Sequence, residues 1–341
     1  IGFILRSTNV RNAFEVYQPL RRLLTTILGS EYKLILSSEW KFSPFTIPET
    51  PRGLEKFAFV GFPASESSNA LVTPLAGHEF GHLLWPAQNM RGQLRKQVRD
   101  QIFTEIRSTQ DEFERIFGEV KNFTDRTLKD LFTSEWSPAY DAALAQIQEV
   151  FCDVLAVRIF GESYLHAFRL LVAPALGQYR DPHYPSLKNR IEYIRKATRS
   201  YGVSLPYNDV DFYEDEDINL PQAQRYWLRL ADHTCHKKVS DVIYFVNKFC
   251  DEQNIGLPAN ANVKEIEQFF SEFIPAHGGY RFSEIVCAGW NCRLNSEFWH
   301  GYHNITQRKE DVLNNLMLKS FEVTEIEDLV SKGTGADASP S

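Results

Sequence analysis

The chain has 341 residues, enough for two domains or for one large domain with an accessory lobe. A hydrophobic fraction of 43% and a charged fraction of 24% are typical of a soluble globular protein. The net charge of −7 argues against nucleic acid as the main partner, because binding to phosphates requires a basic face. Since no stretch approaches the roughly 18 apolar residues that cross a bilayer, we expect no membrane span.

The cysteines are odd in number and form no CxxC pair. We therefore expect reduced thiols and a cytoplasmic location rather than a disulfide framework. They stand at positions 152, 235, 250, 287 and 292. A second metal site, in which Cys235 and His236 join Cys287 and Cys292, is the alternative to buried structural thiols.

In the first 200 residues, the spacing of apolar residues predicts several helices and two short strands. Residues 11–29 carry apolar residues at helical spacing and end at Gly29, which is typical of a helix with a glycine stop. Strand-like runs follow at 32–38 and 56–62, and the second run, KFAFVGF, is either an edge strand or an interior strand. Further helices are predicted over about 74–86, 88–134 (one or two helices), 138–160, 163–173 and 185–200.

An acidic stretch, NDVDFYEDED at 208–217, predicts a solvated linker and a domain boundary. Beyond it, helices are predicted over 221–236, 238–254, 262–274 and about 305–320. The last residues, KGTGADASPS, are typical of a disordered tail. We therefore predict an α+β, mainly helical fold, with a first domain containing a small sheet at 1–205, a helical accessory domain at 206–331 and a disordered tail at 332–341.

The segment TPLAGHEFGHLLWP at 73–86 places two histidines and a glutamate in an apolar helix. Residues four apart lie on one helix face, so His78 and His82 can direct two imidazoles at one ion. Glu79 flanks that ion and can deprotonate its water, as in the H-E-x-x-H zinc pattern. Ordinary core residues are the alternative, but a buried unpaired carboxylate costs several kcal/mol and a metal removes that penalty. This pattern predicts Zn²⁺ as the cofactor.

A catalytic zinc needs a third protein ligand. In some zinc sites of this type, a third histidine stands six residues after the second. This chain has Gln88 at that position, so the third ligand must come from elsewhere in the sequence. The apolar helix QEVFCDVLAVRIF offers Glu149 as the ligand and Asp153 as the acceptor of a free imidazole N–H. Two acids on the wet side of an amphipathic helix are the alternative. The lesser candidates for the third ligand are Glu135, Asp141, Glu162 and His166.

HEFGH at 78–82, followed by EVFCD at 149–153, resembles the gluzincin metallopeptidases. The segment DPHYPSLKNRIEYI at 181–194 makes the chain similar to the soluble catalytic core of the HtpX-like and CAAX prenyl endopeptidase group. That group carries an H-P motif followed by Arg-Ile, and here Tyr184 stands between His183 and the proline.

The resemblance covers about residues 55–200. It implies a zincin-like catalytic domain with His78, His82 and Glu149 as zinc ligands, Glu79 as the general base and Asp153 behind the ligands.

A peptidase also needs a surface for its substrate and a group that stabilises the oxyanion. The KFAFVGF run is a candidate for the first role, because a peptide can add to an edge strand. Candidates for the second are His183, Tyr184 and Arg190, with His166 as a competitor. A helix-capping role for His183 and a salt bridge for Arg190 are the structural alternatives.

We therefore predict a zinc-dependent metallopeptidase that hydrolyses protein or peptide substrates, with Glu79, His183 and Arg190 as catalytic residues. The alternative is a regulatory or ligand-sensing protein with a structural or degenerate zinc site, whose C-terminal domain binds a partner or ligand. An open coordination position favours catalysis, whereas a fourth protein ligand favours a structural site.

Overall fold

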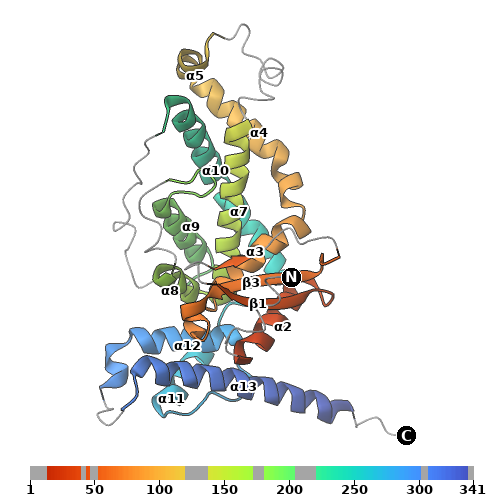
Figure 1. Cartoon of the computed structure of the whole chain (residues 1–341), viewed down its shortest axis with the longest axis vertical. Helices are drawn as coiled ribbons and strands as arrows, with labels where there is room; N and C mark the ends of the chain where they lie inside the picture. The colour runs from red at the N-terminus through yellow and green to blue at the C-terminus, as the bar shows by residue number, and fades with distance from the viewer. Residues whose placement is uncertain are drawn as a thin grey trace.

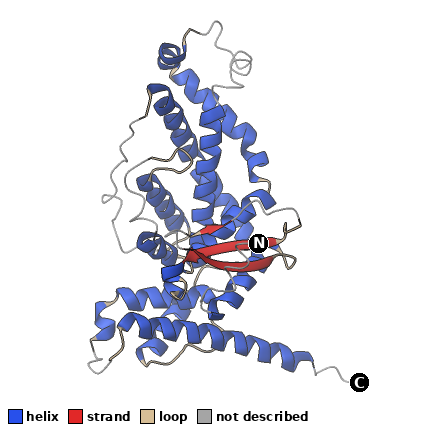
Figure 2. Cartoon of the chain, in the orientation of Figure 1, coloured by secondary structure: helices blue, strands red, loops and turns tan. Residues whose placement is uncertain are grey.

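The computed structural model describes residues 14–39, 44–46, 53–119, 137–171, 180–203, 220–300 and 306–336. The fold is mainly helical with a three-stranded sheet, which confirms the predicted α+β class (Figure 2). The strands are β1 (Lys33–Glu39), β2 (Phe45–Thr46) and β3 (Phe57–Pro63). The helices are α2 (Tyr17–Leu28), α3 (Leu75–Ala87), α4 (Met90–Ser108), α5 (Gln110–Phe117), α7 (Ser137–Phe160), α8 (Glu162–Leu171), α9 (Leu187–Ser200), α10 (Gln222–Glu252), α11 (Asn260–Ser271), α12 (Phe282–Leu294) and α13 (Lys309–Ala336).

The sheet has the strand order β1-β3-β2. β3 pairs in parallel with β1, where Lys33 lies opposite Phe57, and antiparallel with β2, where Phe45 lies opposite Gly61. Six of the seven residues of β3 are buried, as expected of a strand that is covered on both faces. KFAFVGF is therefore the interior strand, and β2, which contacts α3, is the edge strand on that side among the described residues.

Helices α3, α7 and α10 pack side by side and position the candidate site. Gly77 and Gly81 of α3 face α7, and a Cβ at Gly81 would lie only 2.7 Å from Cα of Cys152. The two helix backbones approach closely because these positions lack side chains. α10, which follows the predicted domain boundary, packs along α7, which precedes it (Figure 1).

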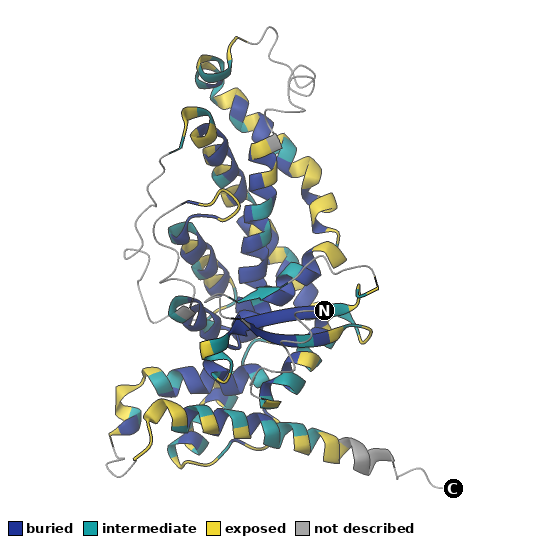
Figure 3. Cartoon of the chain, viewed as in Figure 1, coloured by how far each residue is buried: buried dark blue, intermediate teal, exposed yellow. Residues whose placement is uncertain are grey.

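In Figure 1 the sheet crosses the molecule between an upper group of helices, which includes α4, α7, α9 and α10, and a lower group formed by α11, α12 and α13. The sheet and the facing sides of these helices are buried, whereas the outer face of α4 is exposed (Figure 3). Trp290 of α12 ties the lower group to the turn before α3, because its indole N–H donates to the carbonyl of Leu71 over 3.0 Å.

Most predicted helices are observed, with some differences in extent. The predicted helices at 221–236 and 238–254 form the single helix α10, since no glycine or proline interrupts residues 222–252. α12 was not predicted. α13 continues to Ala336, five residues into the predicted disordered tail, and residues 337–341 lie outside the described part. The acidic linker at 208–217 also lies outside it.

The five cysteines are buried free thiols, as expected. Among the described residues, the grouping of side chains that could hold a metal contains none of Cys235, His236, Cys287 and Cys292, so the alternative second metal site is not formed. None of the described helices combines the length and the apolar character that a membrane crossing requires.

Candidate metal centre

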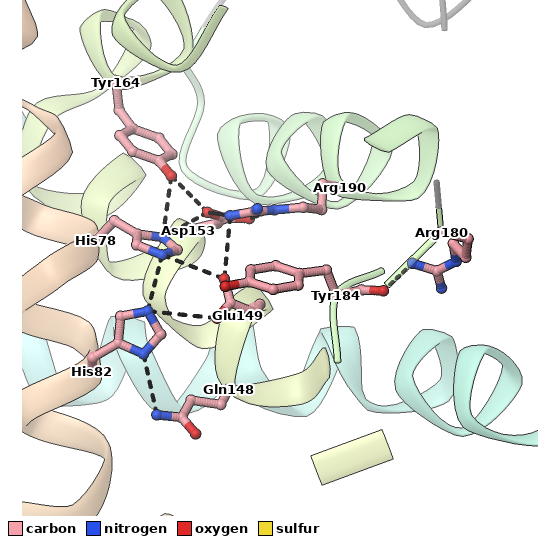
Figure 4. Close-up of polar contacts among 9 residues, drawn as sticks. All are labelled: His78, His82, Gln148, Glu149, Asp153, Tyr164, Arg180, Tyr184 and Arg190. Carbon is pink, nitrogen blue, oxygen red and sulfur yellow. Dashed lines mark hydrogen bonds and ion pairs between the residues drawn. The ribbon is translucent and has the colours of Figure 1, made fainter. Parts of the chain in front are cut away.

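His78 and His82 lie on one face of α3 and turn their rings toward the same point (Figure 4). Their Nε2 atoms are 3.2 Å apart, and their ring centroids are separated by 4.9 Å in an edge-to-face arrangement. The spacing of four residues produces this geometry, because side chains one helical turn apart project in the same direction. Two imidazole nitrogens are thereby available to one ion.

Glu149 of α7 faces both imidazoles. Its Oε2 lies 3.4 Å from Nε2 of His78, and its Oε1 lies 3.5 Å from Nε2 of His82. The residue is 7% exposed, and Oε2 has no hydrogen-bond partner among the described residues. A buried carboxylate oxygen without a hydrogen bond is costly unless another group compensates its charge. The donor set of two imidazoles and one carboxylate fits a zinc ion.

Asp153, one turn further along α7, is the centre of a buried hydrogen-bond network. Its Oδ1 lies 2.8 Å from Nδ1 of His78 and accepts a 2.6 Å bond from the hydroxyl of Tyr164 on α8. Arg190 of α9 donates to both carboxylate oxygens, over 2.9 Å from Nε and 2.7 Å from Nη2. This network orients the His78 ring so that Nε2 points toward His82 and Glu149, as a carboxylate behind a ligating histidine does.

The close charges shift the ionisation of these groups. Burial lowers the pKa of His78, but the hydrogen bond to Asp153 and the nearby Glu149 carboxylate outweigh this effect and raise that pKa to about 10 in the metal-free protein. Burial and the charge of His78 lower the pKa of His82 to about 4. Burial raises the pKa of Asp153, yet the Arg190 guanidinium and His78 hold it well below its usual range.

Glu79 lies next to His78 on α3 and is only 4% exposed. Burial raises its pKa to about 7, partly offset by the charge of His78. The structure thus brings together the candidate base, the two histidines, Glu149, Asp153 and Arg190. Arg190 is 4% exposed, donates to Asp153, and places its Nη2 3.5 Å from Oε2 of Glu149, so it offsets the charge of both carboxylates.

Cys152 is a candidate ligand that the sequence reasoning missed. Its thiol sulfur and one ring nitrogen each of His78 and His82 all lie within 4.8 Å of one another, and the residue is fully buried. The signal was present in the sequence, because Cys152 follows Glu149 by three positions and therefore lies on nearly the same face of α7. The sequence reasoning considered Cys235, Cys287 and Cys292 as possible metal ligands and took Cys152 as a structural thiol.

The segment before α9 brings Tyr184 to the site, and His183 lies apart from it. His183 has a side chain 68% exposed, and its partner among the described residues is Asp181, 2.9 Å away. Tyr184 is 42% exposed, its ring centroid is 5.7 Å from the Arg190 guanidinium carbon, and its phenol points toward Glu149 (Figure 4). The nearby Glu149 charge raises the pKa of Tyr184 to about 12.

Arg180 holds this segment in place. Its guanidinium donates to the carbonyl of Tyr184 and pairs with Asp232 of α10. Gln146 of α7 donates to the carbonyl of Pro182 over 3.1 Å and to Asp232 over 2.8 Å. Residues from α10 therefore fix the loop that carries Tyr184, a contact that the sequence order alone did not suggest.

The lesser candidates lie elsewhere. Asp141 is exposed and pairs with Arg91 over 2.8 Å. His166 packs against Trp290, with ring centroids 5.3 Å apart, and lines a surface hollow together with Glu162. Glu135 lies outside the described residues. We therefore retain Glu149 and Cys152 as candidates for the third ligand.

Comparison of the chain with protein-family models, with curated proteins and with solved structures produced no match in any of the three. The candidate site is consequently interpreted from its own geometry and chemistry.

Proposed function

We propose that the chain is a zinc-dependent metallopeptidase of the gluzincin type. The observation that carries the proposal is the convergence of His78, His82 and Glu149 on one point, where a buried carboxylate oxygen lacks a hydrogen-bond partner. A divalent cation at that point would give this oxygen and both Nε2 atoms a common partner.

The balance of charge supports a divalent cation. Glu79, Glu149 and Asp153 are buried and carry three negative charges when ionised, and Arg190 is the buried cation beside them. Metal ligation requires both imidazoles to be neutral, so His78 gives up the proton that it carries in the metal-free protein. Up to two negative charges then remain uncompensated when Glu79 is ionised. Isolated charges in a protein interior are strongly unfavourable, so an ion of charge +2 suits the site.

The side chains have separable roles in peptide hydrolysis. A bound zinc ion would act as a Lewis acid toward the scissile carbonyl and acidify a water molecule. Glu79 accepts a proton from the attacking water and returns it to the leaving amine. The phenol of Tyr184 donates a hydrogen bond to the developing oxyanion, the role for which His183 and Arg190 were predicted. Asp153 and Arg190 keep His78 in the orientation that ligation needs.

The edge strand β2 is the surface on which we expect a peptide to lie. β2 contacts α3, the helix that carries the histidines, and pairs along one side with the interior strand β3. An extended peptide can add to such an edge through backbone hydrogen bonds. This assignment replaces β3, the strand considered from the sequence.

The test combines metal analysis with cleavage mapping. The purified chain should bind about one zinc ion per molecule and cleave members of a proteome-derived peptide mixture. Glu79→Gln should retain the zinc and lose turnover by at least about 1000-fold, because the base is absent. Glu310→Gln, the same change on an exposed face of α13, should leave both properties unaltered. Cleavage by Glu79→Gln at the parental rate would refute the proposal.

The position of Cys152 favours a second candidate, a regulatory protein with a structural zinc. If its thiolate joined the two imidazoles and Glu149, four protein ligands would close the site. Replacement of zinc by Co²⁺ separates the two candidates, because a thiolate ligand produces an intense near-ultraviolet charge-transfer band. For the peptidase we expect no such band, and Cys152→Ser should retain metal and activity. A band that Cys152→Ser abolishes, in a chain that cleaves nothing, would establish the structural site.

A further inference from the structure

An apolar cavity of about 290 Å³ lies between α2 and α13, beside the end of α7. We propose that this cavity is a binding site for a small uncharged aromatic molecule that carries a hydrogen-bond donor. The cavity shares no residue with the candidate metal centre, so the proposal does not depend on the peptidase assignment.

Aromatic side chains form one wall of the cavity. Phe160 from the end of α7, Phe282 from the start of α12 and Phe321 from α13 line it. The ring centroids of Phe160 and Phe282 are 5.8 Å apart, those of Phe282 and Phe321 are 4.7 Å apart, and both pairs meet edge to face. Aromatic ligands pack favourably against rings in such arrangements.

Hydrogen bonds hold the loops at the cavity wall in place before any ligand binds. The amides of Gly278 and Gly279 donate to Oε2 of Glu327 over 2.9 and 3.1 Å, and Gly279 adopts a left-handed conformation with φ of 77°. The Arg281 guanidinium donates to the carbonyl of Gly256 over 2.9 Å. A ligand therefore meets a largely formed cavity and does not have to order these loops, which favours affinity.

The charged groups beside the cavity decide the chemical class of the ligand. Arg22 of α2 pairs with Glu325 and Asp328 of α13, so two carboxylates surround one guanidinium. Arg281, the other cation on the wall, pairs with Glu284, so one negative charge remains in excess beside the cavity. An anionic ligand would face that charge, whereas a hydroxyl or amine N–H can donate to a carboxylate oxygen. Thr324, also on the wall, has a buried hydroxyl oxygen without a hydrogen-bond partner among the described residues.

The volume sets the size of the ligand. An apolar cavity of about 150 Å³ in another protein takes up benzene. The present cavity is nearly twice as large and is partly open to solvent, so it has room for two fused aromatic rings while a third ring can extend from its mouth. An outer groove lies beside the Arg22 ion pairs, and its lining includes Leu329, which is 68% exposed. That groove serves as the control surface.

The probe for the test is N-phenyl-naphthylamine, an uncharged compound with one N–H whose fluorescence rises in apolar surroundings. Titrated into the full chain, it should saturate at one molecule per chain with a dissociation constant on the order of 10 μM. Anilinonaphthalenesulfonate has the same ring system with an added sulfonate and should bind at least about tenfold more weakly. Equal or tighter binding of the sulfonate would overturn the assigned ligand class.

Substitutions inside and outside the cavity test where the probe binds. Leu23→Trp and Thr324→Met add volume inside the cavity and should each weaken probe binding at least about tenfold, whereas Leu329→Asp in the outer groove should not. Circular dichroism identifies the variants that fold. Unchanged binding in a folded cavity variant, or loss of binding in Leu329→Asp, would overturn the proposal. Independently of variants, saturating probe should slow amide hydrogen exchange at residues 254–256 and 279–281, and unchanged exchange there would exclude this site.

Discussion

Oδ1 of Asp153 lies 2.8 Å from Nδ1 of His78, and this contact determines which nitrogen of His78 faces the centre of the site. When a metal binds, Nδ1 keeps the proton that Asp153 accepts, so Nε2 is the nitrogen that can ligate the ion beside His82 and Glu149. Arg190 and Tyr164 hold the Asp153 carboxylate in turn. The orientation of one ligand thus depends on residues from α7, α8 and α9.

Asp153→Asn should weaken zinc binding by about 10- to 100-fold, since the amide cannot replace the charged acceptor. It should also destabilise the protein by about 3 kcal/mol, because Arg190 would remain buried without its main partner. Chelator competition measures the first effect and denaturant unfolding the second. Asp141→Asn, which removes an exposed ion pair with Arg91, should change the zinc affinity and the free energy of unfolding far less. Equal effects of the two substitutions would contradict the assigned role of Asp153.

Gly81→Ala should destabilise the protein by about 1–3 kcal/mol and weaken zinc binding, because the added methyl group would meet the backbone of Cys152 at 2.7 Å. Gly92→Ala is the matched control. That glycine lies on an exposed face of α4, where the nearest atoms belong to the side chain of Asn89, which can move. This control should be neutral or stabilise the helix by up to about 1 kcal/mol. Thermal unfolding of the two variants compares them directly.

Tyr184→Phe should lower kcat by about 10- to 100-fold with zinc content unchanged, if the phenol stabilises the oxyanion as proposed. The expected effect is on kcat more than on KM, since the hydrogen bond strengthens as charge develops. His183→Ala should have little effect, because its side chain is exposed and pairs with Asp181. Steady-state kinetics on a cleaved peptide measures both. The opposite ranking would restore His183 to the catalytic role that the sequence predicted.

His166 should make the protein less stable as the pH falls. Burial, together with the charge of Arg169, lowers the pKa of His166 from 6.5 to about 4, so the folded state disfavours its protonation. Its contribution to stability is present above pH 6.5 and is lost as the pH falls from 6.5 toward 4, because the unfolded chain takes up the proton first.

The size of that loss is on the order of 2–3 kcal/mol. His166→Phe keeps an aromatic ring against Trp290 and removes the titrating group. Over this pH interval, the free energy of unfolding should fall less in the variant than in the parent chain. Identical pH profiles for the two chains would show that His166 does not contribute.

The local pattern of the sequence predicted most of the fold elements. The glycine stop of α2 is observed at Gly29, where φ is 104°, and the two predicted strand-like runs at 32–38 and 56–62 correspond to β1 and β3. The error in α10 arose because helix ends were inferred from spacing where no residue breaks the helix. α12 was missed because it is almost entirely buried, so its sequence lacks the polar face by which helices are recognised.

For the candidate site too, some features follow from local spacing in the sequence and others from the packing of distant helices. The spacing of His78 and His82 by itself placed two imidazoles on one helix face, and the spacing of Glu149 and Asp153 placed two acids on another, because helical periodicity is a local property. Which of the possible third ligands meets the histidines depends on how α3 packs against α7, and that packing follows from glycines whose close contacts involve residues about 70 positions away.

The tertiary structure alone therefore decided that Glu149 and Cys152 face the histidines, that Tyr184 points toward Glu149 and that His183 is exposed. It also revealed the cavity between α2 and α13, whose walls come from segments at opposite ends of the chain. The sequence by itself determined most of the helices, including α3 and α7, and the donor groups that they carry. Their convergence required long-range packing, because contacts between distant segments depend on the shape of the whole core and leave no periodic signal in the chain.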